Sequence, residues 1–307
     1  MTRVAAVDLG TNSTRLLVAD VVDGAVAEVH RETRITRLGD GVDARRRLLP
    51  VAIARVRNVL ADFRREAERL GAERTLAVAT SAVRDAENGE AFLGELEWSY
   101  GFATRLLSGD EEAAATLRGI HAGIELPAGA VVLDVGGGST ELIADGFAVS
   151  LDVGSVRLTE RFLHADPPAP QELDDAAAQV RGLLPERAFP AAVGVAGTVT
   201  TLAAVDLGRY DPELVHGHRL PRGRVEALTA LLASLPLDER RALPGMEPER
   251  APVIVGGALV VREVLRRYGL DELEVSERDL LWGVALAAAE LPSRTEGDAP
   301  PGAFTCC

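Results

Sequence analysis

The chain has 307 residues, 47% of them apolar and 26% charged, so it can bury one large core or two ordinary ones and is not a disordered protein. All 33 residues of the lysine and arginine class are arginine, which excludes a lysine-containing phosphate loop and Schiff-base chemistry. The formal net charge of −14 argues against general nucleic-acid binding, which needs a basic face, but leaves room for a local anion site.

The first part of the chain begins with strands and then alternates helices with strands. Short apolar runs separated by polar turns predict the strands, and apolar residues at helical spacing predict the helices. The expected elements are strands at Arg3–Leu9, Arg15–Val22 and Ala25–His30, a helix at 51–70, a strand at Thr75–Ala79, a helix from Ser81, a strand ending at Leu107 and a helix from Ser108.

A second block of strands begins near Ala130 and is followed mainly by helices. The expected elements are strands at Val131–Val135, Glu141–Ala144 and Phe147–Val153, helices at 171–184, 222–235 and 252–268, a strand at Ala192–Val195 and a last helix at about 277–290. The tail, 292–307, is rich in proline, glycine and charge, and we expect it to be disordered. This alternation indicates an α/β protein.

The remaining composition favours a cytoplasmic protein. The two cysteines, Cys306 and Cys307, are adjacent and cannot build a disulfide framework or a thiolate metal site. Met1 leads straight into a strand-like run, without the pattern of a signal peptide. No apolar run reaches the roughly 20 residues that cross a bilayer. We therefore expect no membrane contact and no nucleic-acid partner.

One heptapeptide pattern occurs twice. Asp8–Thr14 and Asp134–Thr140 both read D-x-G-x-x-S-T. Each follows a short apolar run, and each precedes two more strands joined by an Asp-Gly turn. The repeated context predicts that the two halves of the chain are copies of one fold.

Both repeats have the composition of a phosphate cradle. Glycine lets backbone N–H groups face an anion, hydroxyls add donors, and the aspartate can hold a metal that neutralises phosphate. The candidate phosphate-binding residues are Gly10, Thr11, Asn12 and Ser13 in the first repeat and Gly136, Gly137, Gly138, Ser139 and Thr140 in the second. The alternative is a plain β-hairpin turn. Neither repeat has the pattern of a dinucleotide site or a serine-hydrolase elbow.

A third glycine-containing loop follows the strand at Ala192–Val195. Gly197 and Thr198 stand where a helix begins, and a helix N-terminus can bind phosphate. The alternative is a tight turn between a strand and a helix.

Two glutamates begin the helix after Ser108. The spacing of Ser108 and Glu111 is that of a capping box, which occupies Glu111 and leaves Glu112 available to a cleft. The alternative is that both are solvated residues of a first turn.

Further acids border the two repeats. Asp134 ends one predicted strand and Glu141 begins the next, so both carboxylates can face the second repeat. The alternative for Glu141 is an ordinary exposed strand residue. Asp8 is the equivalent acid of the first repeat and the weaker metal candidate.

Arginines supply the candidate cations. Arg84 follows Thr80 and Ser81 and can stabilise a transferred phosphoryl group; the alternative is a surface pair with Asp85. Residues 31–57 hold eight arginines and three acids, which can guide a polyanion or simply form a solvated surface.

The duplicated pattern resembles the actin-like phosphotransferases, and five ordered motifs are similar to those of the exopolyphosphatase / guanosine pentaphosphate phosphohydrolase family. The motifs are VDLGTNSTRL at 7–16, TSAVR at 80–84, SGDEEA at 108–113, LDVGGGSTE at 133–141 and AGTVTTL at 196–202. The resemblance covers residues 3–290 and implies the short, two-domain form of the family.

This resemblance implies a duplicated actin-like ATPase (ribonuclease H-like) α/β fold with an interdomain cleft. Domain I would be 1–124 and domain II 125–276, with 277–291 returning as a helix to domain I and 292–307 as a disordered tail. The family also implies a homodimer.

The resemblance further implies metal-assisted hydrolysis of a terminal phosphoanhydride. Glu112 would be the general base, Arg84 would stabilise the transferred group, and Asp134 and Glu141 would hold Mg²⁺ or Mn²⁺, with Asp8 as a further candidate. The two repeats, with Gly197 and Thr198, would bind phosphates.

The expected activity is release of orthophosphate from inorganic polyphosphate, with short chains favoured. The nearest alternative substrate is guanosine pentaphosphate, and another nucleoside triphosphate is a further one. An alternative of another class is a non-catalytic sensor of polyphosphate or an alarmone, although three acids around an anion argue against it. A sugar kinase is the weakest alternative, because no adenosine-binding insertion is visible.

Overall fold

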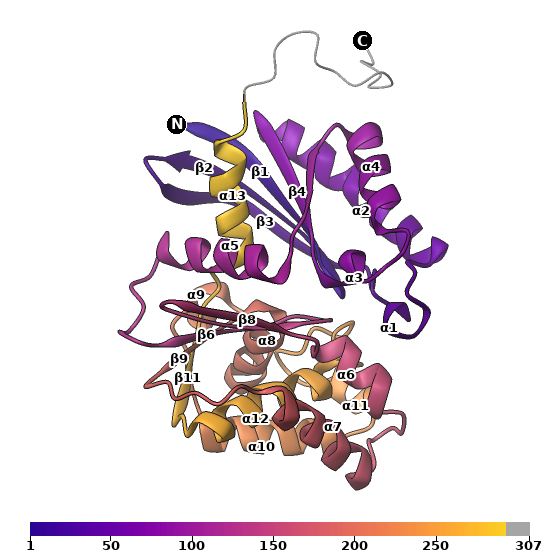
Figure 1. Ribbon diagram of the computed structural model, residues 1–307, viewed down its shortest axis with the longest axis vertical. Helices are drawn as coiled ribbons and strands as arrows, with labels where there is room; N and C mark the ends of the chain where they lie inside the picture. Colours follow the sequence, from indigo (N-terminus) through magenta and orange to yellow (C-terminus); the bar gives the residue numbers. More distant parts are fainter. Residues whose placement is uncertain (293–307) are drawn as a thin grey trace. The chain divides into compact units, whose positions relative to one another are not determined.

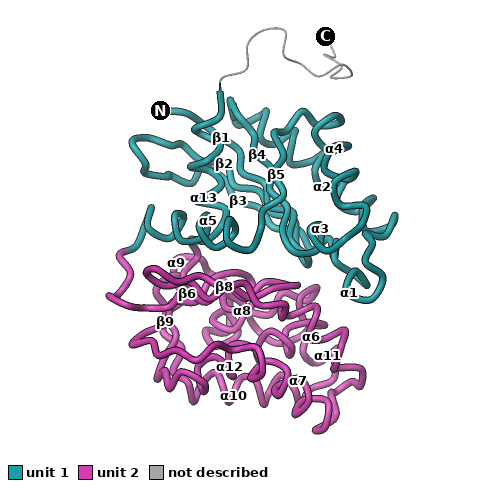
Figure 2. Tube along the Cα trace, in the orientation of Figure 1, with its two compact units in different colours: residues 1–124, 278–307 teal, residues 125–277 magenta. Residues whose placement is uncertain are grey.

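The computed structural model describes residues 1–292, which form two compact units (Figures 1 and 2). Unit 1 contains Met1–Ile124 together with residues 278–292, and unit 2 contains Glu125–Glu277. The disorder predicted for the tail, and the two cysteines, concern residues 293–307, which lie outside the described part.

Unit 1 is built on a five-stranded sheet in the order β3-β2-β1-β4-β5. Its strands are β1 (Thr2–Leu9), β2 (Ser13–Val22), β3 (Ala25–Ile35), β4 (Arg74–Ala79) and β5 (Ala103–Leu106). The first three form an antiparallel meander, whereas β4 runs parallel to β1 and β5 runs parallel to β4. The predicted strands are therefore confirmed.

Alternate residues of β1 enter two different cores. Ala5, Val7 and Leu9 pack in one cluster, and Val4 and Ala6 pack in another. Successive side chains of a strand point to opposite faces, so a sheet covered on both faces requires an unbroken apolar strand. This requirement explains the continuous apolar run in the sequence.

The helices of unit 1 cover those two faces. They are α1 (Val42–Arg45), α2 (Pro50–Arg69), α3 (Ser81–Arg84), α4 (Gly89–Tyr100), α5 (Gly109–His121) and α13 (Leu280–Ala289). Helix α2 places Val56, Leu60 and Phe63 against one face. Helix α13 is buried over almost its whole length on the other, as its uniformly apolar sequence requires.

Unit 2 repeats the sheet of unit 1 and adds a strand. Its strands are β6 (Val131–Val135), β7 (Thr140–Ala144), β8 (Phe147–Leu151), β9 (Ala192–Val195), β10 (Arg219–Pro221) and β11 (Glu272–Val275). The order β8-β7-β6-β9-β11 has the same antiparallel meander and parallel pairs as β3-β2-β1-β4-β5, and β10 is the extra edge strand. The duplicated actin-like, ribonuclease H-like α/β fold is confirmed.

Helices pack around the second sheet. They are α6 (Ser155–Phe162), α7 (Pro170–Leu183), α8 (Ala196–Leu207), α9 (Pro212–Val215), α10 (Arg222–Ser234), α11 (Leu237–Arg241) and α12 (Ile254–Tyr268). The helices predicted at 171–184, 222–235 and 252–268 are α7, α10 and α12, each within two residues at either end. No helix among the described residues is long and apolar enough to cross a membrane.

Helices α5 and α13 touch through two glycines. A Cβ at Gly119 would lie 2.1 Å from the carbonyl oxygen of Asp279, and a Cβ at Gly283 would lie 1.9 Å from that of Ala115. Real side chains do not approach backbone this closely. The catalytic candidate Glu112 is on α5, so this contact also determines where that helix lies.

We expect Gly283→Ala to destabilise unit 1 by about 1–3 kcal/mol, the usual cost of forcing a methyl group into packed backbone. Chemical denaturation, followed by circular dichroism, measures the change. The matched control is Gly94→Ala in α4, where nothing lies within 4 Å of the new methyl group. The free energy of unfolding of that control should rise by up to about 1 kcal/mol, because alanine has a higher helix propensity than glycine. Equal stability of the two variants would contradict close packing of α5 on α13.

Candidate active site

The two repeats fold into the same turn. In the first phosphate loop, Gly10–Ser13, the Gly10 N–H donates to the Ser13 carbonyl oxygen at 3.0 Å. In the second phosphate loop, Gly136–Thr140, the Gly136 N–H donates to the Ser139 carbonyl oxygen at 3.1 Å. Each loop joins the first two antiparallel strands of its sheet, β1 to β2 and β6 to β7.

The carbonyl oxygens of the first loop are held by protein N–H groups. The Asn12 carbonyl accepts from Thr36 and Arg37 at 3.0 and 2.9 Å, and the Thr11 carbonyl accepts from Gly39 at 2.8 Å. The Thr11 hydroxyl also lies 3.1 Å from that of Ser81. These contacts turn the negative ends of the peptide dipoles into the protein.

The second loop is arranged in the same way. The Gly136 carbonyl accepts from the Ser155 N–H at 2.9 Å, and the Gly137 carbonyl accepts from Val156 at 2.8 Å. The Arg157 Nε donates to the Gly138 carbonyl at 2.7 Å. In the described residues no hydrogen bond uses the N–H of Gly137 or Gly138. Amides without an internal partner, next to carbonyls that have one, suit an anion.

Thr140 has a different setting from the other loop residues. Its side chain is fully buried, and its hydroxyl donates to the Val153 carbonyl at 2.5 Å. The corresponding Thr14 bonds to the Thr36 hydroxyl at 2.9 Å. Both threonines hold their hairpins in place, which favours a structural role for Thr140 over a phosphate contact.

The predicted capping box is present at the start of α5. The Ser108 hydroxyl accepts from the Glu111 N–H at 3.3 Å, and the Glu111 carboxylate accepts from the Ser108 N–H at 2.8 Å. The bond from the Ser108 backbone lowers the pKa of Glu111. Glu111 is therefore occupied with the helix start, as its spacing indicates.

Glu112, the next residue, is buried and lies beside Arg84. The Arg84 Nη1 is 3.4 Å from the Glu112 Oε2 and donates to the Leu107 carbonyl at 2.7 Å. The solvated first-turn position considered for Glu112 is therefore wrong, and Arg84 makes no pair with Asp85 among the described contacts. The structure brings the candidate base and the candidate cation of unit 1 together, although they are 28 positions apart.

Asp134 and Glu141 are direct partners across the β6–β7 pair. Both are buried, with 7% and 1% exposure, and the Ser150 hydroxyl donates to Glu141 at 2.7 Å. The alternative of an exposed strand residue is wrong for Glu141. A cation between two opposed carboxylates would offset their mutual repulsion.

At the same register position of the first repeat, an acidic residue faces a basic residue. Asp8 lies opposite Arg15, whose Nε donates to the Asp8 carboxylate at 2.9 Å. Arg15 also forms an ion pair with Asp279, the N-cap residue of α13. Burial raises the pKa of Asp8, although the neighbouring Arg15 opposes this rise. Arg15 thus supplies the cation that faces Asp8, and the pair of acids beside the second loop makes that loop the stronger candidate for a metal.

The donor set at the second loop fits Mg²⁺ or Mn²⁺. In residues 1–292 no group of three or more histidine, cysteine, aspartate or glutamate side chains is arranged to hold a metal. Mg²⁺, however, commonly takes one or two carboxylates and fills its other positions with water and substrate phosphate. Asp134 and Glu141 meet that need, and Asp8 remains the weaker candidate.

The third loop starts α8 and is covered by an arginine. A Cβ at Gly197 would lie 2.2 Å from the Arg250 Nη1, so glycine is needed for the guanidinium to rest there. Thr198 is buried in the first turn of α8. The helix N-terminus suits phosphate, and the Arg250 guanidinium beside it is also paired with Glu247 at 3.0 Å.

Two arginines of unit 2 were not found from the sequence. Arg157 is 7% exposed and contacts the second loop, and Arg250 covers the third. The helix start at Gly154–Ser155, soon after β8, is a sequence signal for Arg157, whereas no spacing in the chain connects Arg250 with Gly197.

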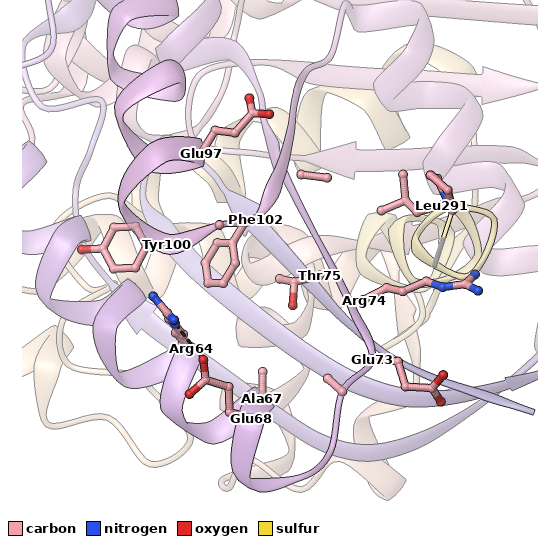
Figure 3. Close-up of a pocket in the computed structure, with 14 residues that line it drawn as sticks. Arg64, Ala67, Glu68, Glu73, Arg74, Thr75, Glu97, Tyr100, Phe102 and Leu291 are labelled. Atoms are coloured by element: carbon pink, nitrogen blue, oxygen red, sulfur yellow. Dashed lines mark hydrogen bonds and ion pairs between the residues drawn. The ribbon is translucent and has the colours of Figure 1, made fainter. Parts of the chain in front are cut away.

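Two cavities of unit 1 lie away from these residues. One, of about 400 Å³, is bordered by α2, α4 and the end of α13, with Arg64, Arg74, Tyr100 and Phe102 around it (Figure 3). The other, of about 420 Å³, lies between β4, α5 and α13. Neither of these two cavities is lined by Glu112 or by a phosphate loop.

Replacing Arg15 by glutamine should leave two buried carboxylates without their cation. We expect the free energy of unfolding to fall by about 3–5 kcal/mol at neutral pH, the cost of breaking a buried ion pair. Removing Arg15 raises the folded-state pKa of Asp8 further above its unfolded value, so the deficit should grow as pH rises and shrink as pH falls toward about 4. Denaturation midpoints between pH 4 and 8 measure this dependence.

The control is Arg3→Gln, which breaks the more exposed pair with Asp20 on the same two strands. It should cost about 1 kcal/mol or less, as exposed pairs do. A loss of stability in Arg15→Gln that does not change with pH would contradict the role given to the Asp8 carboxylate.

The chain is similar to known exopolyphosphatases over almost its whole length. It is 44% identical to exopolyphosphatase 2 of Mycobacterium tuberculosis, covering 94% of this chain and 99% of that protein. It is 30% identical to exopolyphosphatase 1 of the same organism, covering 97% and 90%.

Solved structures agree with this similarity. A crystal structure of an exopolyphosphatase-like protein superposes with a TM-score of 0.86 at 35% identity and covers 93% of this chain and 97% of that one. The Ppx/GppA phosphatase of Aquifex aeolicus superposes with a TM-score of 0.75 at 31% identity, covering 94% and 99%. A profile of the Ppx/GppA phosphatase family matches residues 17–290. With its repeated phosphate loops and their acidic neighbours, the chain belongs to the Ppx/GppA phosphatase family.

Proposed function

We propose that the protein is an exopolyphosphatase that releases terminal orthophosphate from inorganic polyphosphate by metal-assisted hydrolysis. The observation that carries the proposal is the pair of buried carboxylates, Asp134 and Glu141, facing each other at the base of an anion-binding loop. A protein that only bound an anion would gain nothing from two acids there. The names of the two mycobacterial relatives support polyphosphate as the substrate.

In unit 1, Glu112 would accept a proton from the attacking water. Water adds to the terminal phosphorus, the bond to the bridging oxygen breaks, and orthophosphate leaves a chain one phosphate shorter. Arg84, held by the Leu107 carbonyl and 3.4 Å from the Glu112 carboxylate, would stabilise the charge on the transferred group. The first phosphate loop would bind phosphate oxygens through its backbone amides.

In unit 2, the second loop would bind phosphate through the Gly137 and Gly138 amides. Arg157 and Arg250 would add positive charge, and Gly197 and Thr198 would offer a helix N-terminus. Asp134 and Glu141 would hold Mg²⁺ or Mn²⁺, which when bound neutralises phosphate charge. The cleft predicted between the two phosphate loops stays a prediction.

The finer properties are part of the same proposal. They are a preference for short chains, a cytoplasmic location, a homodimeric state and the lack of nucleic-acid or membrane partners. Guanosine pentaphosphate is the alternative substrate, since the same groups would serve its terminal phosphate. A non-catalytic sensor is the alternative of another class.

We expect Glu112→Gln to lower phosphate release from polyphosphate at least about 100-fold, the lower range for loss of a general base. The amide keeps the shape of the side chain but cannot take up the proton. The measurement is orthophosphate release with Mg²⁺ from tripolyphosphate, long-chain polyphosphate, guanosine pentaphosphate and ATP.

The matched control is Glu111→Gln, the neighbouring residue of the same helix turn. Glutamine also serves in a capping box, so this variant should keep turnover near that of the wild type. Near-wild-type turnover in Glu112→Gln would remove Glu112 from the mechanism. Binding of polyphosphate by the wild type without any release would establish the sensor instead.

Glu141→Gln should weaken metal binding. We expect the Mg²⁺ concentration for half-maximal activity to rise about tenfold or more, because one of two carboxylate ligands loses its charge. Calorimetric titration of Mg²⁺ gives a readout independent of turnover. Glu274→Gln, which removes a carboxylate from β11 in the same sheet, is the control. Equal metal dependence in both variants would overturn the assignment.

A further inference from the structure

Three consecutive arginines form an exposed cluster in unit 1. Arg45 ends the short helix α1, and Arg46 and Arg47 follow it. All three are exposed, and none forms a side-chain hydrogen bond or ion pair with the described residues. Here this cluster is called the arginine triplet.

Three arginines of α2 in the same unit are neutralised by acids of that helix. On α2, Arg64 pairs with Glu68, Arg65 with Asp62, and Arg69 with Glu66. In a chain with a net charge of −14, acids are plentiful enough to pair every arginine. The triplet therefore brings together three positive charges, none of which is paired with an acid of the described residues.

The segment that carries the triplet is attached to the first phosphate loop. The N–H groups of Thr36 and Arg37 bond to the Asn12 carbonyl, and that of Gly39 bonds to the Thr11 carbonyl. The same hydrogen bonds that turn the loop's carbonyls away from an anion thus anchor the start of the basic segment.

The other end of the segment is attached next to the Arg84 region. The Arg46 carbonyl accepts from the Glu87 N–H at 2.8 Å. Leu48 exchanges two bonds with the Asn88 side chain, at 2.8 and 3.1 Å. The triplet is therefore held between the first phosphate loop, which belongs to the proposed site, and the turn that follows Arg84.

The backbone of the triplet has a conformation that favours glycine. Arg46 caps the end of α1 with a φ of 53°, in the left-handed region. Glycine is the usual residue at such a helix end, and another residue pays on the order of 1 kcal/mol. Arginine at this position lowers the stability of the fold, and its side chain has no ion pair with the described residues. Its positive charge is therefore available to bind a ligand.

We propose that the arginine triplet binds the part of the polyphosphate chain that lies beyond the terminal phosphates. This inference rests on the proposed function and deepens it, because it names the residues that make affinity depend on chain length. Guanidinium groups match phosphate oxygens with two parallel hydrogen bonds each, and repeated phosphates can meet successive arginines. Tripolyphosphate is too short to use all of these contacts.

The test compares two triple variants with equal loss of charge. The first is Arg45→Gln with Arg46→Gln and Arg47→Gln, and the control is Arg64→Gln with Arg65→Gln and Arg69→Gln. The ratio of kcat/KM for long-chain polyphosphate to that for tripolyphosphate should fall about tenfold in the first variant, the scale of three exposed ion pairs. The control should keep the wild-type ratio.

Salt and direct binding give independent readouts. Affinity for long-chain polyphosphate should fall less steeply with salt in the triplet variant than in the control, because fewer ion contacts form. Binding is measured by calorimetry with wild type and both variants. A duplex DNA of similar charge, offered in competition, should leave polyphosphate bound.

The outcomes separate the two proposals. Active wild type with equal chain-length ratios in both variants overturns the triplet and leaves the exopolyphosphatase intact. Wild type that releases phosphate from no polyphosphate overturns the proposed function. In that case, binding of long-chain polyphosphate still tests the role of the triplet. Weaker binding in the triplet variant than in the control supports that role, and equal binding in the two variants overturns it. Displacement of polyphosphate by the DNA also overturns it.

Discussion

The register of two hairpins is the constraint on which the proposed site depends. One hydrogen bond closes each turn, from Gly10 to Ser13 and from Gly136 to Ser139. Because side chains alternate along a strand, a slip by one residue would move every side chain to the opposite face. The closed turns therefore decide which residue faces Asp8 and which faces Asp134.

The two copies share this geometry but differ in charge. Asp8 faces Arg15, which also joins the N-cap of α13 to the sheet, whereas Asp134 faces Glu141. The first copy thereby uses its acid to connect the C-terminal helix with unit 1. The second keeps two acids beside its loop, which suits a metal. At this one register position, the first copy holds a structural ion pair and the second holds two acids.

Much of the local structure follows from the sequence. The apolar runs predicted the hairpins, and the repeat predicted the duplication, which the sheet orders confirm. The capping box of Ser108 and Glu111 was predicted because its partners are three residues apart. Such features depend on contacts within one turn or one hairpin, where spacing alone determines which groups meet.

Other parts depend on contacts between distant segments. The sequence by itself determined the fold class, the two loops and the acids at their edges, because each is a local pattern of residue types. Only the tertiary structure decided that Arg84 meets Glu112, that Arg250 covers Gly197 and that Arg15 reaches Asp279. It also showed that the arginine triplet is tied to the first phosphate loop. These contacts join residues whose separation along the chain carries no periodic signal, so packing of the sheets and helices had to bring them together.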